Sequence, residues 1–200
     1  HFIICNPDRK ALPLDGHRHV EVLPNGVDFE TFYPNNDTKE YDLLFSGHMS
    51  YIPNISAAKY AATCILPKLP STLKLLIAGI GVTNEIAKLE KDNVIIQEDF
   101  VHIREAFWKS KILLAPMNIS IGLQNKILQA MAMKVPVVCT PQANESINAE
   151  AGTEIVVASN PEEFKEAIER LLTDQEYYHE LSNKAHSFVM ANYDLSLIHI

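Results

Sequence analysis

The chain has 200 residues, of which 47% are hydrophobic, and a formal net charge of -8 at pH 7. This length and composition predict one globular domain whose core needs neither disulfides nor a metal. The acidic balance argues against non-specific nucleic-acid binding, and no apolar run approaches the roughly 20 residues that cross a bilayer.

Strands and helices are predicted to alternate along the chain. Short apolar runs predict strands over residues 1–6, 20–23, 41–45, 73–78, 94–96, 112–116, 136–139 and 154–157. Helical periodicity predicts helices over 54–66, 84–91, 103–110, 123–133, a short one after Gln142, then 161–173 and 175–192. This alternation predicts an α/β fold with a Rossmann-like parallel sheet and helices on both faces.

Parallel sheets of this kind bind ligands outside the carboxyl ends of their strands. Five loops should share that edge: those after Phe45, Ala78, Ile96, Pro116 and Cys139. Gly47 and His48 follow the first of these strands. A glycine there lets backbone amides approach a phosphate, although a plain strand-to-helix turn has the same residues. Gly79 and Gly81 form a second glycine turn, a pattern that more often means only a tight turn.

The segment from Gly122 to Thr140 predicts a turn, an amphipathic helix and a buried strand in succession. Gly122 stands at the predicted helix start, where a diphosphate could approach the free backbone N–H groups. Lys126 is expected one turn into the helix, on the solvent side. The alternative is an ordinary helix that only packs on its sheet.

The same segment, GLQNKILQAMAMKVPVV, resembles the donor-binding motif of family-4 type bacterial glycosyltransferases (glycosyl transferases group 1), which have the GT-B fold. Two further segments agree with this family. Asn25-Gly26-Val27-Asp28, with Phe32 and Pro34, resembles the start of its C-terminal domain. Residues 43–58 resemble its strand, glycine turn and Pro-Asn helix start. Three motifs in the family's order are far more specific than any one of them.

The resemblance implies a domain organisation. Residues 20–194 would form the nucleotide-sugar-binding C-terminal domain of a GT-B enzyme, and residues 1–19 the end of the N-terminal domain and its linker. Residues 195–200, LSLIHI, break the pattern and are interpreted as a non-native tail, with a natural helix end as the alternative.

The function implied is that of a retaining glycosyltransferase that moves a hexose from a UDP- or GDP-linked donor to a glycan or lipid-linked acceptor, in cell-surface polysaccharide synthesis. The nucleotide-sugar is the substrate, and no separate cofactor, metal or nucleic acid is expected. The acceptor would bind through the N-terminal domain, without which the chain should be inactive. The alternative is a non-catalytic nucleotide-binding or interaction module of the same fold.

Localisation is expected to be cytoplasmic, with peripheral association at the inner face of the membrane as a further option. Cys5, Cys64 and Cys139 are odd in number and lie far apart in apolar segments. They are therefore expected to be reduced core residues of an intracellular protein.

The resemblance also implies a set of donor-binding residues. Lys126 would stabilise the leaving diphosphate electrostatically, and no other catalytic residue is assigned. The full predicted nucleotide-sugar site consists of Gly47, His48, Gly122, Leu123, Asn125, Lys126 and Gln129.

Four departures from the family pattern bear on activity. Ile121 and Gln129 stand where relatives commonly carry glutamates, the second of which binds the ribose, and in the closest branch the first is usually arginine. Glu98 and Lys134 replace glycines. Together these four changes, expected at or near the ligand-binding edge, suggest weakened donor binding, altered donor choice or drift from catalysis.

Two remaining polar clusters are less specific. His17-Arg18-His19 lacks a third metal ligand at suitable spacing, so a surface cluster is the better interpretation. The cluster near the edge loop after Ile96 either contacts a nucleotide base or begins a helix, and comprises Asp99, His102, Arg104 and Glu105.

Overall fold

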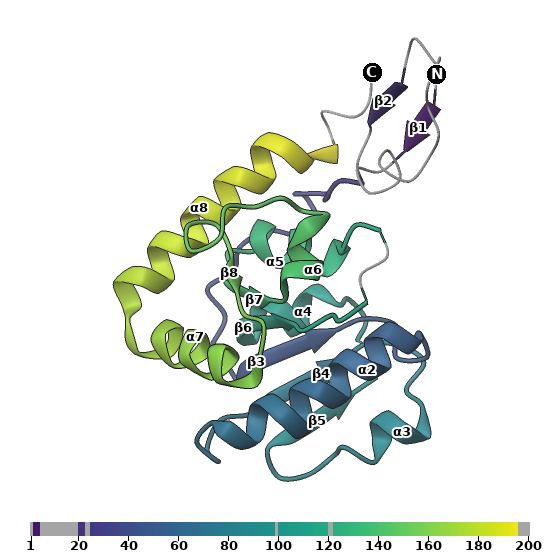
Figure 1. The fold of residues 1–200 in the computed structure, drawn as a ribbon, viewed down its shortest axis with the longest axis vertical. Coiled ribbons are helices and arrows are strands. Elements are labelled where there is room, and N and C mark those ends of the chain that lie inside the picture. The colour runs from purple at the N-terminus through teal and green to yellow at the C-terminus, as the bar shows by residue number, and fades with distance from the viewer. Residues whose placement is uncertain (1, 5–19, 23–24, 99, 120–121, 196–200) are drawn as a thin grey trace.

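The computed structural model describes residues 2–4, 20–22, 25–98, 100–119 and 122–195. Its main body is a six-stranded parallel sheet in the order β5-β4-β3-β6-β7-β8. The strands are β3 (Tyr41–Ser46), β4 (Leu75–Ala78), β5 (Val94–Gln97), β6 (Ser110–Ala115), β7 (Val137–Cys139) and β8 (Val156–Val157). Two further strands, β1 (Phe2–Ile4) and β2 (Val20–Val22), pair with each other in parallel and are drawn apart from the larger sheet in Figure 1.

The strand order places the first strand of the main sheet, β3, at its centre. The chain moves outward from β3 through β4 to β5, then crosses back to β6 on the other side of β3. Leu43 of β3 is level with Leu75 of β4 and with Ile112 of β6. The direction of winding therefore reverses between β3 and β6, the point where sheets of this class bind ligands.

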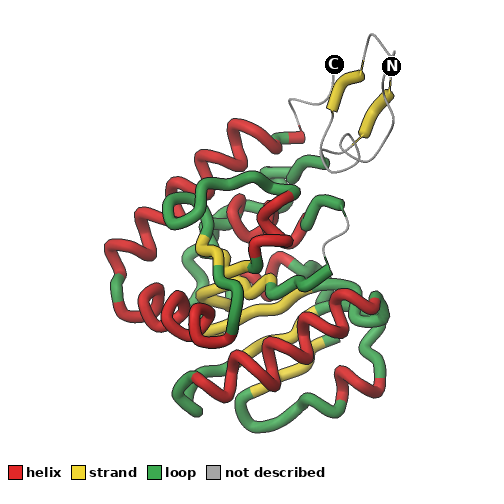
Figure 2. The backbone as a smooth tube through the Cα atoms, in the orientation of Figure 1, coloured by secondary structure: helices red, strands yellow, loops and turns green. Residues whose placement is uncertain are grey.

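The helices of the main body cover the sheet, as Figures 1 and 2 show. The α-helices are α2 (Ile52–Tyr60), α3 (Asn84–Ala87), α4 (Arg104–Trp108), α5 (Asn125–Ala132), α6 (Pro141–Glu145), α7 (Pro161–Thr173) and α8 (Gln175–Tyr193). A π-helical turn (Ala61–Ile65) and a 3-10 turn (Leu66–Lys68) continue α2. The predicted α/β class with a Rossmann-like parallel sheet is confirmed.

The central strands are buried because helices cover both faces of the sheet. Leu43, Leu44 and Phe45 of β3 are fully buried, as are Leu113 and Leu114 of β6. This explains why these strands are continuous apolar runs without the polar alternation of a half-exposed strand.

Most predicted elements are present, with shifted ends. Helix α7 matches its prediction, and Asn160 caps it by accepting hydrogen bonds from the N–H groups of Glu162 and Glu163 at 3.0 and 3.1 Å. The predicted helix over 84–91 is wrong in length, because α3 ends at Ala87. Lys91 and Val94 instead form an antiparallel bridge that turns the chain into β5. The predicted strand 154–157 is reduced to β8.

The Asn-Gly-Val-Asp segment lies beside the end of α8. The N–H of Val27 donates to the carbonyl of Tyr193 at 2.8 Å, and the buried Tyr193 hydroxyl donates to the carbonyl of Ile147. A Cβ on Gly26 would lie 2.6 Å from the Tyr193 carbonyl oxygen, so only glycine fits this crossing. The two ends of the main domain are thereby fastened to each other.

The cysteines only partly match their prediction. Cys139 is buried in β7, where burial raises the pKa of its thiol to about 12. Cys64 is half-buried, which differs from the expected core position because it lies on the outer side of the π-helical turn. Cys5 lies outside the described residues.

Candidate functional site

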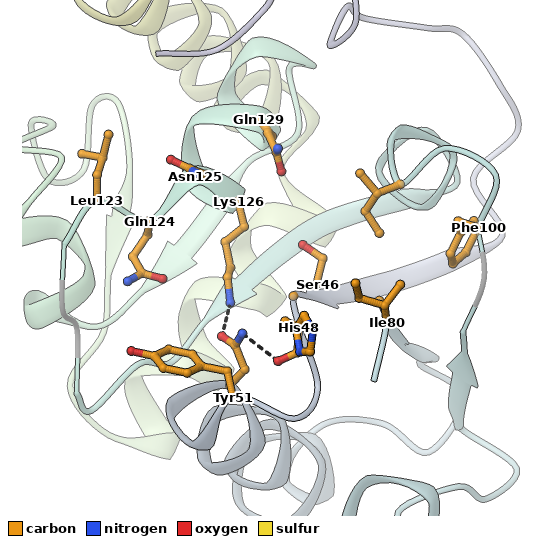
Figure 3. A pocket seen from close by; sticks show the side chains of 14 residues that line it. Ser46, His48, Tyr51, Ile80, Phe100, Leu123, Gln124, Asn125, Lys126 and Gln129 are labelled. Carbon is orange, nitrogen blue, oxygen red and sulfur yellow. Dashed lines mark hydrogen bonds between the residues drawn. The ribbon is translucent and has the colours of Figure 1, made fainter. Parts of the chain in front are cut away.

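A cavity of about 500 Å³ opens at the carboxyl ends of the central strands. It lies beside the reversal point of the sheet, bounded by the loops after β3 and β4, the segment before α4 and the first turns of α5 (Figure 3). Its lining comprises Ser46, Gly47, His48, Tyr51, Asn54, Gly79, Ile80, Phe100, Ile103, Leu123, Gln124, Asn125, Lys126 and Gln129. A pocket of this size accommodates a nucleotide-sized ligand.

Two glycines shape the floor of the cavity. The N–H of Gly47 donates to the carbonyl of Ala78 at 3.1 Å, which brings the loops after β3 and β4 together. A Cβ on Gly79 would lie only 1.8 Å from the carbonyl oxygen of Gly47. The close approach of these two loops therefore requires glycine at position 79.

Lys126 is the cation of the cavity, and its side chain is buried, contrary to its predicted place on the solvent side of the helix. It is the second residue of α5 and only 8% exposed. Its Nζ donates to Asn54 Oδ1 at 2.7 Å, lies 3.9 Å from Met117 Sδ, and stands 4.4 Å from the centre of the Phe45 ring. Figure 3 shows the side chain pointing from α5 toward α2.

The ionisation of Lys126 is shifted by this environment. Burial lowers the pKa of its ammonium from 10.5 to about 7. Among the ion pairs of the described residues, none involves Lys126. A phosphate group entering the cavity would supply the missing anion and raise that pKa again.

The loop after β3 is held by its own polar contacts. The carbonyl of His48 accepts a hydrogen bond from Asn54 Nδ2 at 3.0 Å, and His48 Nδ1 lies 2.9 Å from Ser50 Oγ. The loop therefore presents a fixed backbone to the cavity.

The start of α5 differs in detail from its prediction. Gln124 precedes the helix in a non-helical conformation, so the helix begins at Asn125 and not at Leu123. Gly122 adopts a left-handed φ of +72° three residues earlier and does not line the cavity. The first residues of α5, Asn125 and Lys126, line the cavity instead, and their N–H groups lie at the positive end of the helix.

Six of the seven predicted site residues line this one cavity: Gly47, His48, Leu123, Asn125, Lys126 and Gln129. Their roles toward a ligand stay predictions. Sequence reasoning gave no role to the lining residues Ser46, Tyr51, Asn54, Phe100 and Ile103. Their position in the sequence could have indicated a place in the site, because they lie directly after strands or at helix starts on the ligand-binding edge.

The residues that depart from the family pattern lie in different parts of the structure. Glu98 Oε1 accepts hydrogen bonds from the N–H groups of Gly81 and Val82 at 2.8 and 3.0 Å, so it fastens the glycine turn after β4. Gln129 lines the cavity. Ile121 lies outside the described residues.

Lys134 lies at the far end of α5, which corrects its expected place near the ligand-binding edge. It follows the helix with a left-handed φ of +55°, the conformation that glycine adopts most easily at a helix end. Its Nζ donates to Asn183 Oδ1 at 2.9 Å. The replacement of glycine by Lys134 therefore affects how the helix ends, away from the cavity.

Arg104 begins a helix, one of the two alternatives raised for its cluster. Its guanidinium lies over the rings of Trp108 and Tyr33, at 5.3 and 5.9 Å, and donates to the carbonyl of Thr31. The neighbouring Ile103 is the residue that reaches the cavity. Asp99 and His17 to His19 lie outside the described residues.

No group of three or more His, Cys, Asp or Glu side chains in the described part of the chain is placed to hold a metal ion. None of the described helices is both long enough and apolar enough to span a membrane.

Comparison with known proteins gives one family and a set of similar structures. A family model described as "Glycosyl transferases group 1" matches residues 40–174. None of the curated protein sequences compared with the chain matches it.

Three solved structures illustrate the similarity. Alr3699/HepE from Anabaena, in complex with UDP and glucose, has a TM-score of 0.74 at 14% identity, covering 89% of this chain and 54% of that one. Sucrose-phosphate synthase from Thermosynechococcus elongatus has a TM-score of 0.79 at 15% identity, covering 98% and 55%.

The C-terminal domain of a group 1 family protein, LpcC from Francisella tularensis, has a TM-score of 0.66 at 14% identity, covering 85% of this chain and 100% of that domain. The chain thus spans about half the length of the first two structures. At these identities the similarity shows a shared fold.

Proposed function

The chain belongs to the glycosyl transferases group 1 family, and from this premise we propose that it forms the donor-binding half of a glycosyltransferase. The observation that carries the proposal is Lys126, a buried cation without an ion-pair partner in the described residues, at the wall of a nucleotide-sized cavity. A buried charge is costly unless something pairs with it, and a bound diphosphate would do so.

The donor would lie along the cavity with its diphosphate beside Lys126. The first turn of α5 adds N–H groups and the positive end of the helix dipole on the same side. Ile80 and Phe100 lie on the opposite side from Leu123 and Gln124 (Figure 3), and with Ile103 they offer an apolar wall for the base. UDP and glucose bound to the similar HepE structure support a nucleotide-sugar ligand, and a UDP- or GDP-linked hexose is proposed here.

Catalysis would rest on stabilising the diphosphate as it leaves the sugar. Negative charge grows on the leaving oxygen, and Lys126 and the helix dipole are fixed in place before the reaction begins. Binding of the diphosphate should raise the lysine pKa above about 7, so that the ammonium is charged in the complex. No separate cofactor is included in this proposal.

The wider activity is proposed as retaining transfer of a hexose to a glycan or lipid-linked acceptor, in cell-surface polysaccharide synthesis. The acceptor would bind through a further domain, since the first similar structures are about twice the length of this chain. Transfer should therefore need that domain, while donor binding should not. A cytoplasmic location, with association at the inner membrane face as an option, completes the proposal.

The first test is binding of UDP and GDP to the chain by calorimetry at low salt and pH 7. We expect weak binding of at least one of them. Lys126→Ala should lower that affinity by about tenfold or more, as expected for loss of one charge-assisted contact to phosphate. Lys74→Ala removes an exposed lysine and serves as the control. Equal affinities for parent and Lys126→Ala would contradict the role given to Lys126.

A second prediction concerns Gln129, which lines the cavity one helical turn beyond Asn125. Gln129→Glu should strengthen UDP or GDP binding by up to about 1 to 2 kcal/mol, because a carboxylate accepts ribose hydrogen bonds more strongly than an amide. Inorganic pyrophosphate, which lacks a ribose, is the matched control ligand. If the substitution changes both affinities equally, or weakens nucleotide binding, position 129 does not face the ribose.

A non-catalytic nucleotide-binding or interaction module is the second candidate. The neutral amide of Gln129 in the cavity favours it, because the resemblance places a glutamate there in active relatives. Transfer activity of the chain joined to its upstream domain distinguishes the two. Nucleotide binding without transfer of the bound sugar to any acceptor would support the module.

A further inference from the structure

Asn54 is the side chain that holds Lys126 in place. It lies on α2, is only 7% exposed, and uses both ends of its amide. Its Oδ1 accepts from Lys126 Nζ at 2.7 Å, and its Nδ2 donates to the carbonyl of His48 at 3.0 Å. Figure 3 draws both hydrogen bonds, which join α5, α2 and the loop after β3 at one point.

Among the described residues, the groups in contact with the ammonium are uncharged. Besides Asn54 they are the Met117 sulfur and the Phe45 ring, and the described titratable side chains that line the cavity with Lys126 are His48 and Tyr51. An amide oxygen fixes the direction of a lysine without cancelling its charge. A carboxylate at the same place would do both, because it would form a buried ion pair.

The pair lies directly under the loop that faces the cavity. A Cβ on Gly47 would stand 2.7 Å from Asn54 Nδ2 and 3.2 Å from Lys126 Nζ. The positive charge is therefore held close to the backbone of Gly47, at the wall of the cavity.

We propose that Asn54 is a positioning residue of the donor site, which holds the Lys126 ammonium under the Gly47–His48 loop and leaves its charge uncompensated for the diphosphate. This inference rests on the proposed donor-binding function. It assigns importance to the neutrality of residue 54. Asparagine and aspartate share one shape, but the carboxylate carries a charge and cannot donate to the His48 carbonyl as Asn54 Nδ2 does, a loss that Asn54→Ala shares.

The deciding substitution is Asn54→Asp. The new carboxylate should pair with Lys126 and repel the diphosphate, so that UDP affinity at pH 7 falls by about tenfold or more. The matched control is Asn183→Asp, because Asn183 also accepts from a lysine, Lys134, at 2.9 Å but lies on the surface. It adds the same net charge and should change UDP affinity by less than about twofold.

The pH profile separates positioning from a merely structural role. Lys126 of the parent must take up a proton to bind UDP at pH values above about 7, so parent affinity should fall from pH 7 to pH 9. The carboxylate of Asn54→Asp should keep Lys126 protonated throughout, so the affinity of this variant should be low and nearly constant over the same range. A variant that only loosened the fold would keep the parent's slope.

Asn54→Ala is the second variant, and it places no new charge beside Lys126. It should lose affinity by about threefold or more while keeping a fall with pH, because Lys126 stays unpaired but is no longer held. Normal thermal unfolding of each variant confirms that it is folded.

The outcomes distinguish this inference from the function on which it rests. If the parent binds neither UDP nor GDP, the proposed function fails and the role of Asn54 fails with it. If the parent binds and Lys126→Ala weakens binding, but Asn54→Asp matches the parent in affinity and pH profile, only the role of Asn54 is overturned.

Discussion

Replacing Gly79 by alanine should lower the free energy of unfolding by about 3 kcal/mol or more, among the largest effects expected of one methyl group. The added Cβ would lie 1.8 Å from the Gly47 carbonyl oxygen, far inside van der Waals contact. The obstacle is backbone, which cannot rotate away as a flexible side chain can. The φ of Gly79, +151°, adds a conformational cost for any residue with a side chain.

Urea unfolding of the parent and the variant measures the effect. Gly152→Ala is the matched control, since Gly152 also has a positive φ, +83°, but a Cβ there meets nothing within 4 Å. We expect a loss of only about 1 to 2 kcal/mol for the control. Equal losses for the two variants would falsify the close approach of the loops after β3 and β4. A variant that folds should also bind UDP or GDP less well, since Gly47 lines the cavity.

The fold could be predicted because its local signals agree with one another. The buried parts of β3 and β6 are apolar runs, and α5 and α7 have periodic apolar faces, so the alternation and the α/β class follow directly. The strand order was not predictable in the same way. It depends on which direction each crossover takes, and that is decided by packing between elements far apart in sequence.

The wrong helix length after Thr83 shows the same limit on a smaller scale. Residues 84–91 have helix-compatible types, but Lys91 and Val94 bond to each other across a tight turn. This turn leads into β5, whose Val94 pairs with Leu75 of β4, and the helix therefore ends early, which propensity alone cannot indicate.

The location of the candidate site was predictable from the sequence, but the arrangement of its side chains was not. Its edge follows from the rule for parallel sheets, and six of the seven predicted residues do line one cavity. Helical periodicity could not show that Lys126 turns inward, because its partner Asn54 lies 72 residues earlier in the chain. The sequence predicted Lys126 on the solvent side of the helix, where burial would not lower the pKa of its ammonium.

Replacing Lys126 by methionine should stabilise the free protein at pH 6 by about 2 to 4 kcal/mol, as the buried charge costs about 1.4 kcal/mol per unit of pKa shift. The folded-state pKa of about 7 lies below the unfolded value of 10.5, so the unfolded chain binds this proton more tightly. The penalty is therefore complete below pH 7. It falls as pH rises from 7 toward 10.5, because the parent gains stability there.

The advantage of Lys126→Met should accordingly shrink between pH 7 and pH 10, as measured by urea unfolding of both proteins at each pH. Cys139 and Tyr178, whose pKa values burial raises to about 12, weaken both proteins at high pH and cancel in the difference. Lys74→Met, at an exposed lysine, should show no such trend. A constant difference across this range would mean that Lys126 is not buried as a cation. A shrinking difference, together with the loss of UDP or GDP binding in the same variant, would show that the chain retains a destabilising charge because its ligand needs it.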